Sequence, residues 1–478
     1  MPKSTLISST SHSSSPSSSP AESSGDGAPG GSTWKLVALG MAVTVLLLVA
    51  GAVGFSQSND DVPQAAPPAA AAAPFVATFR ASPGAPLTDL IAQLQAQLES
   101  TPNDYVSWAT LGLAYVQQAR ISVNPTFYNL AEGALDQSFE ANDDDNFLGY
   151  AGRSSLASAR HEFALAKQYA LEGIEINEFS ALLWGALGDA ETQLGNYEAA
   201  AEHVQRMVDL SPDTASLARV SYTWELRGDL TQATELMNRA LEVAPTPDDR
   251  AFALYFLGEL AFGQGDADAA LGYYNEAVRV APADIAASAG RAKALAATGQ
   301  LETAVDAYAA LVERVPDPAY LTAYGALLQS LGREAEAEEQ FGVVQVTRAL
   351  YRTNGVQPDA AEILFLADHG DPAEALELVE SASVKVAFLA EHDAYAWALY
   401  RNGRFEEALE QSRLALATGI QNASYLYHSG MIQNALGNTA EAIAELSAAL
   451  DLNPHFDLIG AVEAAETLAE LAPNSDDA

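Results

Sequence analysis

Residues that could carry out chemistry are few in this chain, and they do not fall into catalytic patterns. Its 478 residues include seven histidines and no cysteine. The absence of cysteine excludes disulfides, cysteine nucleophiles, thiolate zinc sites and covalent haem attachment. His161 precedes Glu162, but no second histidine follows four residues after the first, as a zinc-protease helix requires. We therefore predict no catalytic residue, no bound cofactor or metal, and no small-molecule substrate.

Two short segments could bind a phosphate or a metal ion. Gly263-Gln264-Gly265 has the glycine spacing of a phosphate loop, but a helical pattern precedes it where such loops follow a strand, so we interpret it as a turn. Residues 142–146 contain three consecutive aspartates that could hold calcium. They lack the central glycine and distal glutamate of an EF-hand loop, which favours a solvated turn and leaves calcium as the alternative.

The charge of the chain limits its partners. The formal net charge is −40, and 49% of the residues are hydrophobic. A strongly acidic protein repels the phosphates of nucleic acids, so we expect no nucleic-acid partner.

A 34-residue unit organises most of the sequence. Residues 251–284 contain two apolar runs with helical spacing, separated by Gly265-Asp266 and ended by Pro282. Residues 285–318 repeat this pattern in register. The pattern predicts a helix, a turn, a second helix and a stop.

This unit resembles the tetratricopeptide repeat, whose pattern is W-x2-L-G-x2-Y, then A-x3-F, then P. Residues 181–214 match it best, with Trp184, Leu187, Gly188, Gly195, Tyr197, Ala200 and Pro212. We expect Gly188 and Ala200 to let two helices approach closely, and Gly195 to supply the turn.

The resemblance implies an all-α, right-handed α-solenoid of about ten repeats over residues 87–472. First helices are expected to begin at residues 105, 147, 181, 214, 251, 285, 318, 389 and 423, with a weaker unit before 389. Residues 458–471 are expected to form a capping helix, with Asp457 as its N-cap, and residues 473–478 an acidic tail. The apolar residues expected to cover the last repeat are Leu458, Val462, Ala465, Leu468 and Leu471.

The N-terminal region predicts a membrane anchor. Residues 1–33 are rich in Ser, Pro and Gly and are expected to be disordered, whereas residues 36–55 contain no charge and are long enough to span a bilayer. We place a transmembrane signal anchor at residues 34–56 and a Pro/Ala-rich linker at residues 57–86. Lys35 before the apolar segment and acidic residues after it favour repeats outside the cytoplasm. A cleaved signal peptide is the alternative.

In the family that the chain resembles, first helices line a concave groove that binds protein segments. The positions implied to face this groove are Tyr222, Phe252, Tyr255, Phe262, Lys293, Trp397, Tyr400, Arg401, Tyr427 and Met431. Aromatic anchors dominate many interfaces, and the cations could pair with a partner carboxylate. The alternative is that these side chains pack against neighbouring first helices.

The leading functional hypothesis is a membrane-anchored, bacterial protein-interaction scaffold that binds a protein or peptide. The segment before and including the first repeat, residues 94–115, resembles membrane-bound factors of cytochrome c maturation, which makes a cell-envelope assembly factor one alternative. A non-catalytic subunit of an enzyme complex is another.

Overall fold

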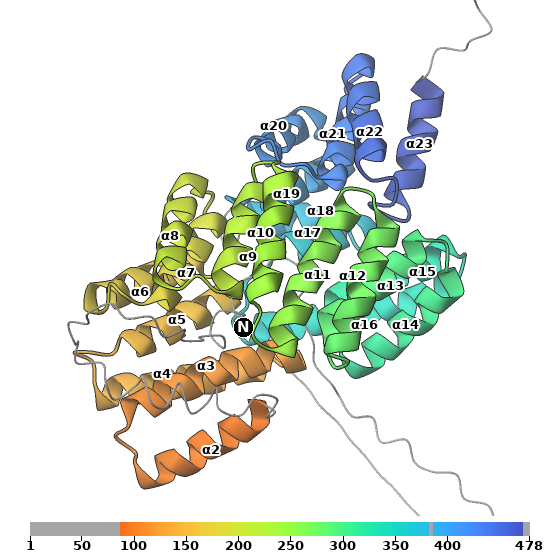
Figure 1. The fold of residues 1–478 in the computed structure, drawn as a ribbon. Helices are drawn as coiled ribbons and strands as arrows, with labels where there is room; N and C mark the ends of the chain where they lie inside the picture. Colours follow the sequence, from red (N-terminus) through yellow and green to blue (C-terminus); the bar gives the residue numbers. More distant parts are fainter. Residues whose placement is uncertain (1–86, 382–385, 472–478) are drawn as a thin grey trace, which may run out of the picture. The chain divides into compact units, whose positions relative to one another are not determined.

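A computed structural model of the chain describes residues 87–381 and 386–471, which belong to one compact unit (Figure 1). These residues form 22 α-helices, and no strand occurs among them. The helices follow one another as pairs, with each first helix packed on its own second helix and on the next pair. The prediction of an all-α solenoid of helix pairs is therefore confirmed for the described residues.

Ten helix pairs form the repeats, and one further helix stands at each end. The pairs are α3 (Tyr105–Ser122) with α4 (Thr126–Ala141), α5 (Phe147–Ala159) with α6 (Phe163–Ile176), α7 (Ala181–Gln193) with α8 (Tyr197–Leu210), α9 (Thr214–Glu225) with α10 (Leu230–Val243), α11 (Pro247–Gly263) with α12 (Ala267–Val280), α13 (Ile285–Ala297) with α14 (Leu301–Arg314), α15 (Pro318–Ser330) with α16 (Glu334–Thr353), α17 (Ala360–His369) with α18 (Pro372–Glu380), α19 (Leu389–Arg401) with α20 (Phe405–Ala415), and α21 (Ala423–Ala435) with α22 (Thr439–Leu452). Helix α2 (Leu87–Ser100) precedes them, and α23 (Gly460–Leu471) follows.

The predicted starts of first helices are correct except at the fifth repeat. Helix α11 begins at Pro247, four residues before the predicted start. The hydroxyl of Thr246 accepts a hydrogen bond from the backbone N–H of Asp249, and Pro247 occupies the first turn. A capping threonine followed by proline is a strong helix start, and it extends the helix beyond the repeat pattern.

In nine of the ten repeats the turn contains a residue with positive φ; in the eighth, Gly370 between α17 and α18 has a φ of −127°. Gly195, Gly228, Gly265, Gly299, Gly332, Gly403 and Gly437 occupy this position with φ between 71° and 81°. Val123 and His161 adopt the same conformation in the first two repeats, although it is uncommon for residues with a side chain. The tight turn at Val123 lets α4 begin at Thr126.

Glycines on first helices let large side chains of second helices enter the core. The ring of Tyr274 on α12 is fully buried between Gly258 and Gly290. A Cβ atom at either position would overlap this ring, so only glycine leaves room for it. Gly188 was expected to allow close packing in the third repeat, and a Cβ there would lie 2.7 Å from a methyl of Val204. This confirms the role predicted for Gly188.

The C-terminal helix caps the last repeat with a face that agrees only in part with the one predicted. The carboxylate of Asp457 accepts hydrogen bonds from the backbone N–H groups of Ile459 and Gly460, as predicted for an N-cap residue. Helix α23 itself begins at Gly460, and not at residue 458 as predicted. Its buried residues are Gly460, Ala461, Ala464 and Thr467. Of the predicted covering residues, Leu458 and Leu468 are partly buried against the core, whereas Val462 and Ala465 are exposed.

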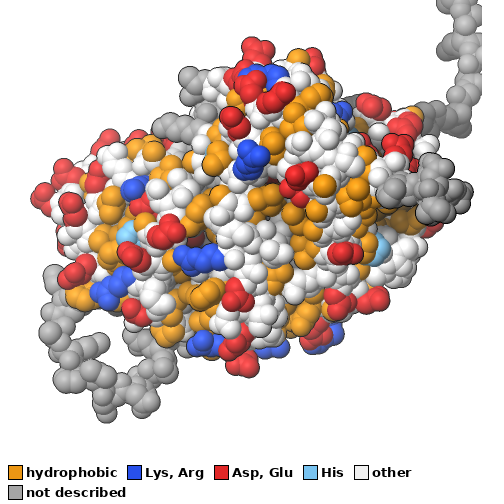
Figure 2. All heavy atoms as spheres, turned by 90° about the horizontal axis from the view of Figure 1, so that it is seen from above, with side chains coloured by type: hydrophobic (Ala, Val, Ile, Leu, Met, Phe, Trp, Pro, Cys, Tyr) orange, Lys and Arg blue, Asp and Glu red, His pale blue; other side chains and the backbone are white. Residues whose placement is uncertain are grey.

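The described surface is acidic. Figure 2 shows Asp and Glu side chains spread widely over one face, with Lys and Arg in only a few places. No helix among the described residues is long and apolar enough to cross a bilayer. The predicted anchor at residues 34–56, the disordered segment 1–33, the linker 57–86 and the tail 473–478 lie outside the described residues and stay predictions.

Candidate partner-binding surface

The predicted positions in the fifth and sixth repeats form a packed aromatic cluster. Tyr255 and Phe262 on α11 pack with Tyr274, and the rings of Tyr255 and Tyr274 lie 5.9 Å apart. The ammonium of Lys293 on α13 lies 4.4 Å from the centre of the Phe262 ring and 2.7 Å from a carboxylate oxygen of Glu259. Lys293 therefore already has an anionic partner within the chain.

Two other predicted positions, Phe252 on α11 and Tyr222 on α9, are partly buried outside this cluster. Phe252 is half-buried and packs edge-to-face against Phe256, with ring centres 4.8 Å apart. Tyr222 on α9 is half-buried against Leu226 and Phe388. Burial raises the pKa of Tyr222 well above its usual value, so its hydroxyl stays protonated at neutral pH.

The predicted positions in the ninth and tenth repeats form a second cluster. Trp397 on α19 stacks on Tyr400 with ring centres 4.7 Å apart, and its indole lies 5.5 Å from Tyr427 on α21. The indole N–H of Trp397 and a guanidinium N–H of Arg401 both donate to Asp368 on α17, at 2.7 and 2.6 Å. Asp368 thus joins the eighth repeat to the ninth.

Sequence reasoning missed the polar partners of these side chains. Lys293 and Glu259 are 34 residues apart, and Arg401 and Asp368 are 33 residues apart. The hydroxyl of Tyr427 donates to Glu463 on α23, 36 residues later. Each separation is close to one repeat. A search for complementary polar residues placed one repeat apart could therefore have identified these pairs.

The expectation that the groove positions face solvent is wrong for five of them. The exposed fractions are 8% for Tyr255 and Phe262, 3% for Trp397, and 5% for Tyr427 and Met431. First helices of successive repeats approach closely, so these side chains pack between them, as the alternative interpretation held. Tyr222, Phe252, Lys293 and Tyr400 are partly exposed, and Arg401 is exposed. Partner binding by any of these residues stays a prediction.

Tyr222 on α9 and Tyr425 on α21 both pack against a small buried core formed by Leu226, Phe388 and Leu389. Burial, reinforced by the negative charge of Glu259, raises the pKa of Glu225 to about 7. Burial also raises the pKa of Tyr425, with further contributions from Asp393 and from Tyr222. This core therefore joins the fourth repeat to the ninth and tenth repeats.

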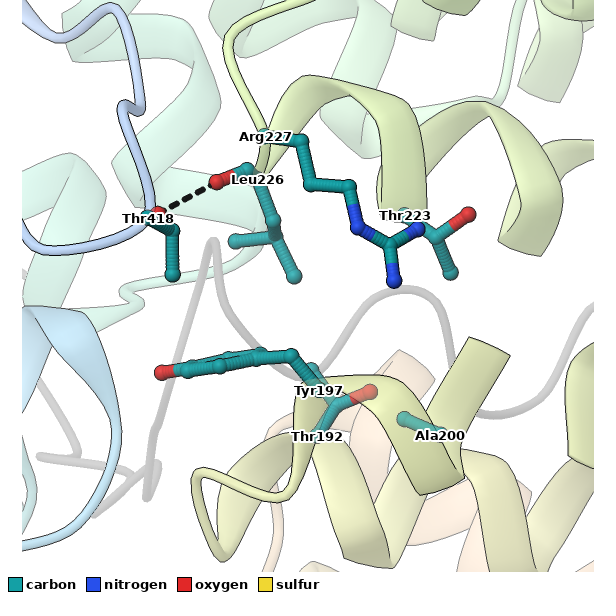
Figure 3. Close-up of a pocket in the computed structure, with 7 residues that line it drawn as sticks. All are labelled: Thr192, Tyr197, Ala200, Thr223, Leu226, Arg227 and Thr418. Carbon is teal, nitrogen blue, oxygen red and sulfur yellow. Dashed lines mark hydrogen bonds between the residues drawn. The ribbon is translucent and has the colours of Figure 1, made fainter. Parts of the chain in front are cut away.

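A small cavity lies beside this core, where the third and fourth repeats meet the segment after α20 (Figure 3). Its volume is about 10 Å³, which is the space of one water molecule. Figure 3 shows the ring of Tyr197 facing Leu226 across the cavity, with Thr418 hydrogen-bonded to the carbonyl of Leu226. This cavity is too small to receive a partner side chain.

The acidic segment 142–146 forms the turn between α4 and α5. Asn146 caps α5 by accepting the N–H of Gly149, and its amide donates to the hydroxyl of Ser138. Among residues 87–381 and 386–471, no group of three acidic or histidine side chains could hold a metal ion.

Comparison with known families agrees with this architecture. Profiles described as tetratricopeptide repeat match residues 148–215, 213–283, 261–328 and 394–455, together about half of the chain. The chain belongs to the tetratricopeptide repeat family. No curated protein matches it significantly.

Several solved tetratricopeptide-type structures are similar to parts of this repeat protein. TTC0263, a thermophilic TPR protein of Thermus thermophilus, is 18% identical over 40% of this chain and 98% of its own, with a TM-score of 0.36. The APC/C hetero-tetramer Cut9–Hcn1 is 16% identical over 77% of this chain and 76% of its own, with a TM-score of 0.41. Yeast Tom70 is 13% identical over 82% and 87%, with a TM-score of 0.35.

Proposed function

We propose that this tetratricopeptide repeat protein is a non-catalytic, membrane-anchored scaffold that binds a protein or peptide partner. The observation that carries the proposal is the series of ten repeats among the described residues, since stacked repeats provide an extended surface for a partner. Side chains that remain accessible at the predicted positions, above all Arg401 and Tyr400, are the candidate contacts.

A site-specific crosslinking experiment tests the scaffold. A photo-crosslinking residue placed at Arg401 in the full-length, membrane-associated protein should capture one defined partner. The matched control is the same residue at Arg413, which is exposed on the second helix of the same repeat. Capture of the same proteins from both positions, or of none from Arg401, would contradict a binding surface at the first helices.

The anchor proposal rests on residues 36–55, which contain no charge over a length that spans a bilayer. Protease added to intact spheroplasts should digest the repeats if they lie outside the cytoplasm. Complete protection would reverse the orientation, and release into the soluble fraction would indicate a cleaved signal. Co-purification from membranes would distinguish a general scaffold from a cytochrome c maturation factor or an enzyme-complex subunit, both of which stay predictions.

A further inference from the structure

The outer face of α16 is apolar at two positions where other second helices are charged. Val343 and Val346 are 40% and 65% exposed. In α6, α8, α10 and α12, both equivalent positions carry charges: Glu172 and Glu175, Arg206 and Asp209, Arg239 and Glu242, and Glu276 and Arg279. The buried residues of each helix fix this equivalence, since Phe341 of α16 occupies the position of Tyr274 in α12.

Helix α16 is also longer than its counterparts. It has 20 residues, whereas α12 and α14 have 14 each. Ala349 stands where the two preceding repeats have Pro282 and Pro316, which cannot continue a helix. Because alanine favours the helix more than any other residue, α16 continues to Thr353, and its outer face extends by further turns.

The apolar and small residues of this face form one stripe. They are Gly342, Val343, Val346, Ala349 and Leu350, and we call them the α16 stripe. Their spacing of three and four residues places them on one side of the helix. Four are exposed and Leu350 is half-buried, and nothing lies within 4 Å of the Cβ position at Gly342. An apolar helix face left in solvent over this length indicates contact with another surface.

The α16 stripe is complementary to itself in the antiparallel orientation. When two copies are related by a two-fold axis at Val346, Gly342 of each copy faces Leu350 of the other, and Val343 faces Ala349. A smaller residue therefore meets a larger one on both sides of the centre, which lets the two helices interdigitate. A surface that matches itself about a two-fold axis is what a symmetric dimer requires.

Charged residues beside the α16 stripe favour the same orientation. Glu338 is exposed near the start of α16, and Arg352 lies on the same edge of the helix about four turns later. Arg352 pairs with Glu362, yet 41% of its side chain stays exposed. Antiparallel helices bring Glu338 of each copy close to Arg352 of the other, whereas parallel helices would place like charges side by side.

We propose that the α16 stripe binds the same stripe of a second copy of this chain, antiparallel and centred on Val346, in a two-fold symmetric homodimer. This goes beyond the proposed scaffold function, because it needs no other protein and uses no first helix. Stable interfaces bury about 1,200–2,000 Å² in total. A contact built around one helix pair is small by that measure, so the dimer should dissociate in the micromolar range.

The absence of cysteine allows a direct test in the full-length protein. In a Val346→Cys variant the two thiols meet at the two-fold axis, so mild oxidation should crosslink the dimer about tenfold faster than in Glu313→Cys. Glu313 is the matched control, because it is exposed at the equivalent position of α14. Val343→Cys alone should crosslink slowly, whereas a mixture of Val343→Cys and Ala349→Cys should crosslink fast, because these positions face each other.

Equal rates for Val346→Cys and Glu313→Cys would overturn the dimer. Fast crosslinking of Val343→Cys with itself would indicate parallel helices and would overturn the antiparallel pairing. Since Val346 is 65% exposed, the cysteine variant should fold as the wild type does.

A second measurement needs no cysteine. In sedimentation of the full-length protein in a mild detergent, Val343→Glu should weaken dimerisation by about tenfold or more, because it places a carboxylate in each half of the apolar contact. The matched control is Leu414→Glu, since Leu414 is 46% exposed at the same position of α20, and it should change dimerisation by less than about twofold. Equal effects of the two substitutions, or a wild type that stays monomeric up to about 0.1 mM, would reject the dimer. Either result leaves the scaffold proposal standing, because that proposal concerns the first helices.

Discussion

The imidazole Nδ1 of His428 on α21 lies 2.9 Å from both carboxylate oxygens of Asp393 on α19, 35 residues earlier. Both side chains are buried, and the imidazole also stacks on Trp397 with ring centres 4.2 Å apart. Burial alone would lower the pKa of His428, but the charge and hydrogen bonding of Asp393 outweigh it and raise the pKa. This buried hydrogen-bonded pair links the ninth and tenth repeats.

This pair predicts a pH-dependent stability. Because the folded-state pKa of His428 is raised, its contribution is fully present below the unfolded pKa of about 6.5 and is lost as pH rises through the folded value. Asp393→Asn should cost about 3–5 kcal/mol at pH 6, and less at pH 9. Urea unfolding at both pH values measures the difference. An equal loss at both would show that the pair is not ionised.

A second prediction concerns the glycine that receives Tyr274. Gly290→Ala should destabilise the protein by about 1–3 kcal/mol, because the new methyl overlaps the buried ring. Gly272 on α12 has nothing within 4 Å of its Cβ position, so Gly272→Ala should stabilise by about 0.5–1 kcal/mol. Thermal unfolding compares the two variants. Stabilisation by both would mean that Tyr274 moves aside at little cost.

Asp317, the N-cap of α15, gives the third prediction. Burial raises its pKa to about 7, although it accepts the backbone N–H of Ala319. A raised folded pKa means that stability falls as pH rises from about 4 to 7. Asp317→Asn keeps a capping side chain without the charge, so it should be more stable than the wild type at pH 8 and show a flatter pH profile.

Asp317→Ala is the control for this prediction. It removes the charge and the cap together, and should be less stable than Asp317→Asn by about 1 kcal/mol. Urea unfolding from pH 4 to 8 tests all three proteins. A wild-type profile that rises between pH 4 and 7 would contradict the raised pKa.

The repeat period predicted most of the fold because each repeat contacts mainly its neighbours. Punctuating residues such as Gly195 and Asp457 act locally, so their roles could be inferred from sequence. Exposure of the groove positions could not be predicted, because it depends on how closely successive first helices approach. The contact between Tyr197 and Leu389 could not be predicted either. These residues are 192 positions apart in the chain, and whether they meet depends on small rotations summed over five repeats.

The burial of the groove aromatics leads to a fourth prediction. Tyr255→Ala and Phe262→Ala should each cost about 3–5 kcal/mol, the range for buried aromatic side chains. Phe179→Ala is the control, since Phe179 is 66% exposed and its truncation should change stability by less than about 0.5 kcal/mol. Thermal unfolding close to that of the wild type for Tyr255→Ala would restore the interpretation of this residue as a binding anchor.

The last prediction tests the face of the C-terminal helix. Ala464 is fully buried against the tenth repeat, whereas its neighbour Ala465 is exposed. Ala464→Glu should place a carboxylate in the contact between α23 and α21, release the helix, and expose Tyr427 and Met431, which contact Glu463 and Thr467 on α23. We expect a lower unfolding midpoint and concentration-dependent association, measured by light scattering, because the uncovered edge of a solenoid is apolar. Ala465→Glu adds the same charge one residue later and should leave both unchanged. The opposite ranking would mean that the helix packs through Val462 and Ala465, the face that the apolar pattern predicts.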